Sequence, residues 1–254
     1  VIMLKPIPDG KMYNFYIDDN IFFFTDIHRH SFRSIFDNFY LAGLKQAHER
    51  FGTRFTLNSF CHNWHEPSFD ITMFPDRYRT EFEQNADWLR FAFHGYSEFP
   101  EYPYSRAYPE KIEGHYQLWH REMCRIAGEQ SLTAPVIFHY YEAAPECRGF
   151  MRKLGMKFYA LPPEEKFRIN TELDQYEMPV DAILNLFKAD ISALRACLEN
   201  RIAAGQDKLL IGSHEQYAYR HYENFIPEYF DGLFAACETM KKHGYESVYF
   251  NELV

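Results

Sequence analysis

Three apolar stretches of the sequence each end in side chains that can bind a metal ion or transfer a proton. These side chains are Asp18 and Asp19, His94 with Glu98 four positions later, and His214. Imidazole nitrogens and carboxylate oxygens are common zinc ligands, and a histidine titrates close enough to neutral pH to act as a general acid. The pattern therefore predicts that three distant chain segments meet at one catalytic or metal-binding centre.

Each of these residues also has a plain structural interpretation. An Asp-Asp-Asn sequence suits a turn or a helix N-cap, so Asp18 and Asp19 could simply end a strand. His94 and Glu98 face the same way only if the residues between them form one helical turn. His214 could be a buried histidine bonded to the backbone. From the residues alone, both interpretations stay open.

Short apolar segments and amphipathic segments alternate about seven times along the chain. The predicted strands cover residues 11–18, 54–60, 88–94, 136–141, 157–161, 180–185, 208–213 and 246–250. The predicted helices cover about 38–50, 75–85, 109–128, 145–155, 190–205 and 228–243. Such alternation requires parallel strands joined by crossover helices, and the carboxyl ends of these strands carry the residues described above.

The predicted fold is a single α/β barrel domain over residues 1–254. No glycine-rich phosphate loop follows the first predicted strand, which disfavours Rossmann and P-loop folds. Two segments have more than one interpretation. Residues 22–24 fit a strand or a short buried helix, and residues 162–179 fit an irregular excursion or a small hairpin.

The composition is ordinary except for its aromatic share. Hydrophobic residues make up 46% and charged residues 25%, but aromatic residues reach 19%. We expect most aromatic side chains in the core and some along a cleft for sugar rings. Trp64, Tyr96 and His139 are the predicted substrate-binding residues, although His139 also fits a histidine buried within an apolar strand.

Charge and cysteine usage bear on partners and compartment. The net charge of −9 and the absence of a basic stretch argue against nucleic acid or an anionic membrane surface as the main partner. No apolar run approaches the length of a membrane span. Five widely spaced cysteines without a Cys-x-x-Cys pair suggest a reducing, cytoplasmic location. Nothing in the sequence indicates an oligomeric state.

The order of these motifs resembles the polysaccharide deacetylases of the NodB-like class, also called carbohydrate esterase family 4. Their motifs are an apolar strand ending in Asp-Asp, a later strand ending in His-x-x-x-His, an Arg-x-Pro segment, and a late strand ending in Leu-x-His. Residues 15–20 are similar to the first motif, residues 93–98 to the second and residues 210–214 to the last. The resemblance covers nearly the whole chain, including residues 240–250.

The resemblance implies a distorted (β/α)7 barrel and a divalent metal, usually zinc, bound by Asp19, His94 and Glu98. It assigns Asp18 as the general base and His214 as the general acid. The implied reaction is the hydrolysis of N- or O-acetyl groups of a carbohydrate by metal-bound water.

The sequence departs from the family pattern at three places, and two other functions stay open. Glu98 stands where the family has histidine, Asn20 where it usually has glycine, and residues 143–145 read Ala-Ala-Pro in place of Arg-x-Pro. One alternative is a metal-free glycoside hydrolase that uses two carboxylates, such as Asp19 with Glu98 or Glu142. The other is a non-catalytic carbohydrate-binding protein with a decayed site.

Overall fold

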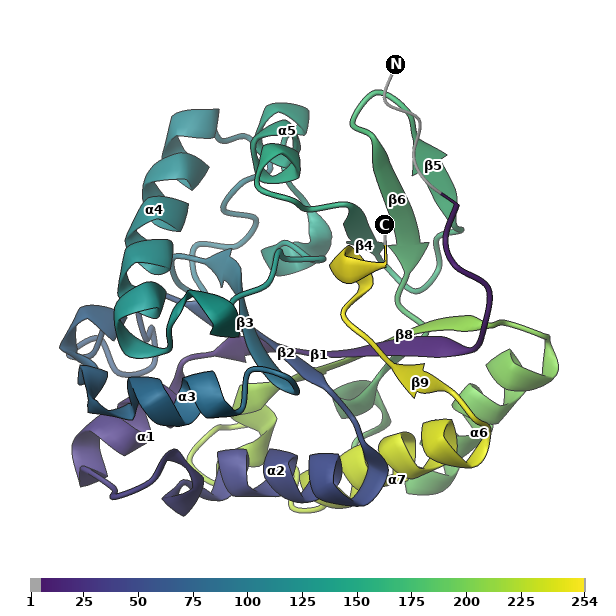
Figure 1. Ribbon diagram of the computed structural model, residues 1–254, viewed down its shortest axis with the longest axis horizontal. Helices are drawn as coiled ribbons and strands as arrows, with labels where there is room; N and C mark the ends of the chain where they lie inside the picture. The colour runs from purple at the N-terminus through teal and green to yellow at the C-terminus, as the bar shows by residue number, and fades with distance from the viewer. Residues whose placement is uncertain (1–5, 254) are drawn as a thin grey trace.

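The computed structural model describes residues 6–253 as an α/β fold (Figure 1). Its strands are β1 (Met12–Asn20), β2 (Phe55–Phe60), β3 (Leu89–Gly95), β4 (Phe158–Leu161), β5 (Arg168–Asn170), β6 (Gln175–Pro179), β7 (Ala182–Ile183), β8 (Lys208–His214) and β9 (Glu246–Ser247). Its α-helices are α1 (Phe22–His30), α2 (Phe39–Phe51), α3 (Arg79–Gln84), α4 (Pro109–Ile126), α5 (Pro145–Lys153), α6 (Ile191–Ala203) and α7 (Tyr229–Lys242). The predicted alternation of strands and helices is confirmed.

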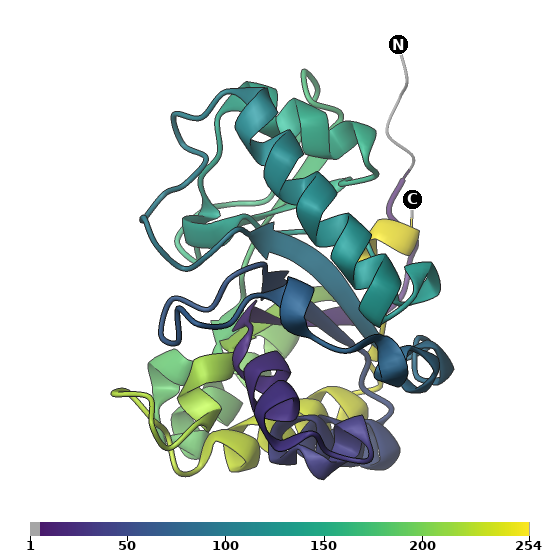
Figure 2. The same cartoon turned by 90° about the vertical axis from the view of Figure 1, so that its left-hand side faces the viewer.

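The main sheet has the strand order β3-β2-β1-β8-β7, with β9 paired to β1, and all of its pairs are parallel. Helices α2 and α7 lie on one side of this sheet and α4 lies on the other (Figures 1 and 2). Strands covered on both faces consist of nearly continuous apolar residues, and every residue of β1 after the first is buried. This burial explains why the strands appear in the sequence as apolar runs.

A second, smaller sheet has the order β4-β6-β5. Its β4 and β6 are parallel, whereas β5 and β6 are antiparallel and form a hairpin. Of the two interpretations of residues 162–179, the hairpin is therefore the one that the structure adopts.

Four backbone hydrogen bonds join the two sheets into a distorted ring. They run from Thr133 N to Phe91 O (2.8 Å), from Ala160 N to Val136 O (2.5 Å), from Val180 N to Leu161 O (3.0 Å) and from Asp181 N to Leu210 O (2.8 Å). Residues 132–138 thus stand between β3 and β4, and the chain that leaves β6 crosses to β8. Counted around the ring, the positions are β1, β2, β3, residues 132–138, β4, the β6–β7 run and β8. The predicted distorted (β/α)7 barrel is confirmed.

The fourth predicted strand, residues 136–141, is the main error in the sequence-based assignment. The chain leaves its extended path after Val136–Phe138, and His139–Tyr141 form a 3₁₀ turn. Tyr140 and Tyr141 have φ angles of +62° and +58°. Two successive residues in the left-handed region turn the chain sharply, and no hydrophobic period in the sequence indicates such a turn.

Three other elements are shorter than predicted or resolve an ambiguity. The strand expected at 180–185 is reduced to β7, because a 3₁₀ turn (Leu184–Phe187) follows directly. The strand expected at 246–250 is reduced to β9. Residues 22–24 form the beginning of helix α1.

Most of the large aromatic side chains lie in the core, as expected. Phe23, Phe24 and Phe91 pack together, with ring centroids of Phe23 and Phe24 4.0 Å apart and those of Phe24 and Phe91 5.8 Å apart. Aromatic packing of this kind contributes much of the buried apolar area. Within residues 6–253, no helix has both the length and the apolar character needed to cross a membrane.

Candidate active site

The carboxyl ends of β1, β3 and β8 meet at one cleft of about 670 Å³. The cleft is lined by Asp18 and Asp19 from β1, His94 from β3, His214 from the end of β8, and His139 from the 3₁₀ turn after residues 132–138. Asp18 lies directly beside His214 in the register of the β1–β8 pair. The expectation that three distant strand ends converge is therefore confirmed.

Asn20 shapes the end of β1 so that two successive aspartates can serve one cleft. Its buried amide donates to the carbonyls of Ile17 (2.5 Å) and Asn58 (3.1 Å) and accepts a hydrogen bond from Tyr40 Oη (2.9 Å). Asp19 has a φ of +61°, which bends the strand at this point. In a straight strand the two aspartates would point to opposite faces, so the bend is what brings both into the cleft.

Asp19, His94 and His139 offer three ligand atoms at the spacing that a metal site requires. His94 Nε2 lies 3.2 Å from Asp19 Oδ1, His139 Nδ1 lies 3.4 Å from the same oxygen, and the two nitrogens are 3.2 Å apart. Zinc bonds of about 2.0–2.1 Å at tetrahedral angles place neighbouring ligand atoms about 3.3 Å apart. All three residues are buried, and together they form a group that could hold a metal ion.

The hydrogen bonds from outside this triad engage other atoms, so its three ligand atoms are directed at one another. Gln216 Nε2 donates to the other oxygen of Asp19, Oδ2 (2.8 Å), whereas Oδ1 is buried without a hydrogen-bond partner. His139 Nε2 lies 2.7 Å from the carbonyl of Glu98, which leaves Nδ1 directed at Asp19 and His94. An unsatisfied buried carboxylate oxygen is costly unless a cation completes its surroundings. The residues present therefore fit a divalent metal.

The electrostatics of the triad favour an ionised aspartate. Burial alone would raise the pKa of Asp19, but the rings of His139 and His94 outweigh that effect and hold the pKa well below its ordinary range. Burial lowers the pKa of His94 to about 4. Burial also opposes the charged form of His139, but the Asp19 carboxylate and the Glu98 carbonyl outweigh it and raise the pKa of His139. The triad thus contains a carboxylate, a neutral imidazole and a second imidazole whose proton a bound metal would displace.

Asp18 stands next to the triad as a carboxylate of different character. Burial, reinforced by the charge of Asp19, raises the pKa of Asp18 well above its ordinary value. Asn58 Nδ2 donates to Asp18 Oδ1 (2.7 Å), and His94 Nδ1 lies 3.8 Å from the same oxygen. A carboxylate with a raised pKa is a stronger base than an ordinary aspartate, and its fixed position beside the triad suits the role of general base.

His214 is held from its far side by an amide. Its Nδ1 lies 2.9 Å from Asn185 Oδ1, in the turn after β7, so Nδ1 carries the proton of that hydrogen bond. Nε2 is then the nitrogen that can exchange a proton with a bound substrate. Burial lowers the pKa of His214, although the charge of Asp19 opposes the shift.

The predicted ligand set of Asp19, His94 and Glu98 differs in one member from the group of residues that the structure brings together. Glu98 lines the cleft, but its carboxylate is bonded to His65 Nε2 and does not join the Asp19–His94 pair. His139, which the sequence suggested as a substrate-binding or core residue, takes that third place. The physical reason is the left-handed turn at Tyr140 and Tyr141, which ends the extended chain and directs the His139 ring inward.

Two predicted substrate-binding residues lie outside the lining of the cleft. Trp64 is half exposed and packs against Phe99, and Tyr96 stacks on His62. The aromatic residues that do line the cleft are Tyr102, Tyr140, Tyr141, Tyr217 and Tyr222, together with Phe138. No sequence period marked these tyrosines, but the polar Asn58 within an apolar strand was a visible sign of a role for that residue.

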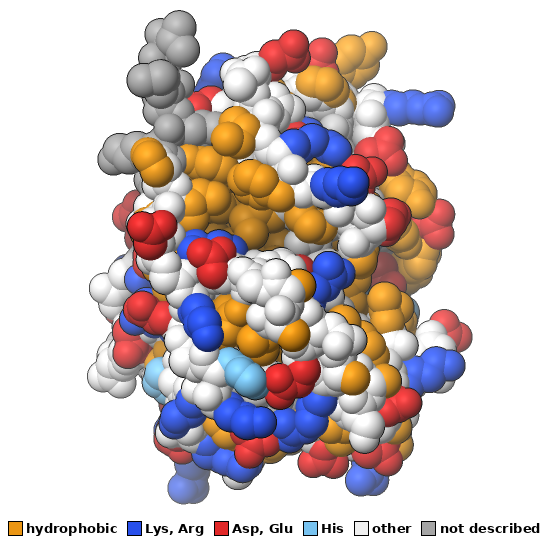
Figure 3. Space-filling model, turned by 90° about the vertical axis from the view of Figure 1, so that its right-hand side faces the viewer, with side chains coloured by type: hydrophobic (Ala, Val, Ile, Leu, Met, Phe, Trp, Pro, Cys, Tyr) orange, Lys and Arg blue, Asp and Glu red, His pale blue; other side chains and the backbone are white. Residues whose placement is uncertain are grey.

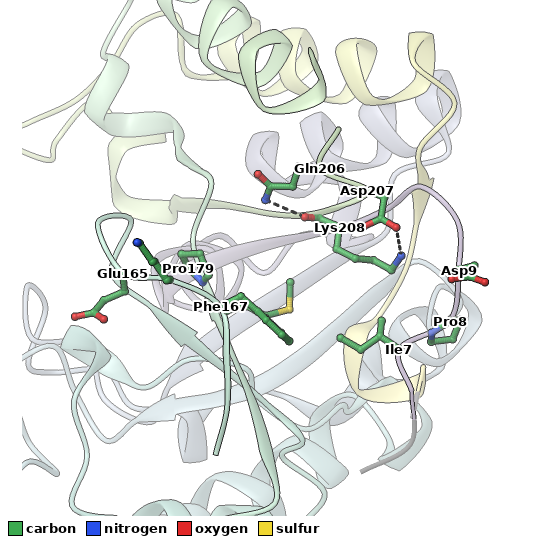
Figure 4. A pocket seen from close by; sticks show the side chains of 11 residues that line it. Ile7, Pro8, Asp9, Glu165, Phe167, Pro179, Gln206, Asp207 and Lys208 are labelled. Carbon is green, nitrogen blue, oxygen red and sulfur yellow. Dashed lines mark hydrogen bonds and ion pairs between the residues drawn. The ribbon is translucent and has the colours of Figure 1, made fainter. Parts of the chain in front are cut away.

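A second large cavity, of about 550 Å³, lies at the amino-terminal end of β8 and carries no comparable cluster (Figure 4). Apolar side chains gather around a hollow on this face of the molecule (Figure 3). Two lysines line it, Lys166 and Lys208, and the ammonium of Lys208 bonds to Gly10 O (2.6 Å) and lies 3.2 Å from Asp207 Oδ2. The titratable groups that could do chemistry converge only on the other cleft, among the residues that the structure describes.

Comparison with known proteins supports the fold that this site occupies. No family model and no curated protein matches the chain. The chitin deacetylase from the fungal pathogen Colletotrichum lindemuthianum aligns with 17% identity over 100% of this chain and 93% of its own, with a TM-score of 0.56. A family 4 acetyl xylan esterase from Clostridium thermocellum, in complex with a cobalt ion, aligns with 14% identity over 96% and 90%, with a TM-score of 0.57.

The chain has the polysaccharide deacetylase fold. The resemblance noted from the motifs is thereby confirmed for the fold. A CE4 family pseudoenzyme from Bacillus anthracis aligns as well, with 10% identity over 94% of this chain and 64% of its own, and a TM-score of 0.50. Since the polysaccharide deacetylase fold includes a pseudoenzyme, the function has to be argued from the side chains of the cleft.

Proposed function

We propose that this protein is a metal-dependent deacetylase that hydrolyses N- or O-acetyl groups of a carbohydrate. The observation that carries the proposal is the Asp19–His94–His139 group, with its ligand atoms 3.2–3.4 Å apart, beside Asp18 and His214 in one cleft. A ligand set of one carboxylate and two imidazoles suits zinc and leaves a coordination position for substrate or water. Zinc is therefore the proposed metal.

When bound, the metal would supply Lewis-acid polarisation of the acyl carbonyl and activation of water. Asp18 accepts the proton of the attacking water, because it is fixed by Asn58 and has a raised pKa. His214, when both of its ring nitrogens are protonated, gives the Nε2 proton to the leaving amine or alcohol, while its Nδ1 donates to Asn185 Oδ1. Gln216 keeps the carboxylate of Asp19 oriented toward the two histidines.

The charge of the cleft supports a neutral or cationic carbohydrate as the substrate. Four carboxylates line it, those of Asp18, Asp19, Glu98 and Glu142, and no lysine or arginine is among its lining residues within the described chain. The guanidinium of Arg148, on the nearby helix α5, is bonded to Gln175 and Glu177 instead. Apart from the metal and the histidines, the charged groups that an anionic sugar chain would meet in the cleft are carboxylates, which would repel it, whereas they would attract an amino sugar.

The test is acetate release by the purified protein from N-acetylated and O-acetylated oligosaccharides, after metal removal and after loading with zinc or cobalt. We expect one metal ion per chain, activity that depends on it, and loss of both on His94→Ala. A protein whose metal content stays at background after loading would contradict the proposal. Activity that survives strong chelation would favour the metal-free glycoside hydrolase.

A non-catalytic carbohydrate-binding role is the second candidate, and one observation favours it. Ala143 occupies the position of the arginine in the Arg-x-Pro motif, so no guanidinium lies in the cleft to orient Asp18. Glycan binding without acetate release, unchanged by Asp18→Asn, would select this role.

A further inference from the structure

The third metal ligand of the proposed site depends on a carbonyl group for its orientation. His139 Nε2 lies 2.7 Å from the backbone oxygen of Glu98, so the ring donates its Nε2 proton there and directs Nδ1 at the centre of the triad. Outer hydrogen bonds of this kind fix the tautomer and angle of a ligating histidine. The contacts that fix the position of the Glu98 carbonyl therefore also fix the orientation of the His139 ring.

The turn that carries this carbonyl is tied down at two points. Tyr96 O accepts hydrogen bonds from the backbone nitrogens of Cys61 (3.0 Å) and His62 (2.8 Å). Two residues further on, the carboxylate of Glu98 is bonded to His65 Nε2. The loop after β2 is thus bound to the turn after β3 by two backbone hydrogen bonds and by the His65–Glu98 ion pair.

His65 itself is fixed by buried groups on its own loop. Its backbone nitrogen donates to Asn63 Oδ1 (3.0 Å), and the buried Asn63 amide donates to Thr25 Oγ1 (2.9 Å) on helix α1. Its ring packs edge-on against Phe22 and Tyr222. A side chain held in this way can transmit a fixed position to its partner, which an exposed ion pair between mobile chains cannot do.

We propose that His65 and Glu98 are positioning residues that orient His139 for metal binding through the Glu98 carbonyl. In the family motif the residue at position 98 would bind the metal itself. In this protein the Glu98 carbonyl instead accepts a hydrogen bond from His139, and His139 is the residue that binds the metal. The inference rests on the proposed function for the metal, but the orientation of His139 exists without one and can be measured separately.

The experiment compares metal affinity and the His139 ring in a small set of variants. Zinc and cobalt affinities are measured by competition with a chromophoric chelator, and the tautomer of His139 is read from ¹⁵N NMR of the metal-free protein. We expect His65→Ala and Glu98→Ala each to weaken affinity about 10-fold, at the lower end of the range for outer partners of metal ligands. His65→Gln keeps a donor near Glu98 and should restore most of the affinity.

The matched control is His221→Gln, because His221 stacks on the same Phe22 ring but has no bond to Glu98. It should leave affinity and the His139 tautomer unchanged. The double variant His65→Ala/Glu98→Ala should be no weaker than either single variant, since both remove one ion pair.

Two results would overturn the inference, and neither coincides with failure of the proposed function. In the first, His65→Ala binds metal as tightly as the parent protein and keeps the same His139 tautomer. In the second, Glu98→Ala abolishes binding while His139→Ala does not, which would make Glu98 a ligand. If the parent protein binds no metal, the proposed function falls, and an unchanged His139 tautomer in His65→Ala would still decide against the positioning role.

Discussion

Two buried carboxylates of this protein, Asp19 and Glu177, have contrasting surroundings. Glu177 on β6 is bonded to Arg148, Arg168 and Asn170, so both of its oxygens have partners. Asp19 receives one hydrogen bond, from Gln216, and its other oxygen faces two imidazole nitrogens without a hydrogen bond. Both residues are almost fully buried.

The difference separates a carboxylate that holds the fold together from one that is kept open for a ligand. A buried charge is tolerated when hydrogen bonds and counter-charges replace its lost hydration, as around Glu177. Around Asp19 that replacement is incomplete in the protein alone, and a divalent cation would complete it. The comparison therefore predicts that changes at the two carboxylates affect different properties.

The largest expected effect is the loss of metal binding on His139→Ala. The variant removes one of three ligand atoms, so affinity should fall by far more than the roughly 10–100-fold typical of outer partners, and acetate release should fall to background. Metal content after gel filtration measures this directly. His120→Ala, at a partly buried position of α4 outside the cleft lining, is the control that should keep both metal and activity.

Asp18→Asn should separate catalysis from metal binding. The amide keeps an oxygen for the Asn58 hydrogen bond but cannot accept a proton, so kcat should fall roughly 10²–10⁴-fold while metal content stays at the parent level. Because burial and Asp19 disfavour the ionised form of Asp18, the variant should unfold at the same or a higher temperature. A fall in metal content as large as the fall in kcat would assign Asp18 to the ligand set.

Asp18 and His139 also show which parts of the site could be predicted from the sequence and which could not. Asp18, Asp19, His94 and His214 each follow an apolar strand, and the carboxyl ends of parallel strands share one edge, so their convergence could be predicted from patterns along the chain. His139 could be noticed but not assigned, because its direction is set by a left-handed turn at Tyr140 and Tyr141. Residues of this type rarely adopt that conformation, and no local pattern encodes it.

The position of Glu98 could not be predicted for a different reason. Its partner His65 lies 33 residues away on another loop, so the ion pair is a product of tertiary packing. The barrel itself was predictable from the alternation of segments, except where residues 132–138 complete the ring through isolated hydrogen bonds. Periodicity identifies regular elements, and this part of the ring is irregular.

On the structural side of the comparison, Glu177→Ala should destabilise the protein and leave the metal site intact. Removing Glu177 leaves the mostly buried guanidinium of Arg148 without its ion-pair partner. Breaking a buried pair in this way lowers the free energy of unfolding by about 3–5 kcal/mol. Chemical denaturation of the metal-free protein measures the loss, and zinc affinity under native conditions should not change. Glu165→Ala, which removes only an exposed partner of Arg168, should cost about 1 kcal/mol or less.

The same carboxylate predicts a pH dependence of stability. Burial opposes it, but Arg148, Asn170 and Arg168 together lower the pKa of Glu177 below its ordinary value of 4.5. A lowered folded-state pKa contributes stability above about pH 4.5, and that contribution is lost as the pH falls through the folded-state value. Glu177→Gln should therefore show a shallower fall in Tm between pH 5 and pH 3 than the parent protein, in buffers of about equal ionic strength. Parallel curves for the two proteins would contradict this origin of the acid sensitivity.

The smallest expected effect is on substrate charge, at the rim of the cleft. Glu142 is an exposed carboxylate of the cleft lining for which the described chain provides no ion-pair partner. Changing its sign with Glu142→Lys should raise kcat/KM for an acetylated oligosaccharide that carries a uronic acid, relative to a neutral one, by up to about fivefold for each of the two units of charge changed, since one charge pair in water is worth about 1 kcal/mol at 4 Å. The ratio should shrink as salt is added, because exposed charges are screened. Glu146→Lys adds the same charge on α5 outside the cleft lining and should leave the ratio unchanged; an equal response to both variants would show that net charge, and not the cleft, selects the substrate.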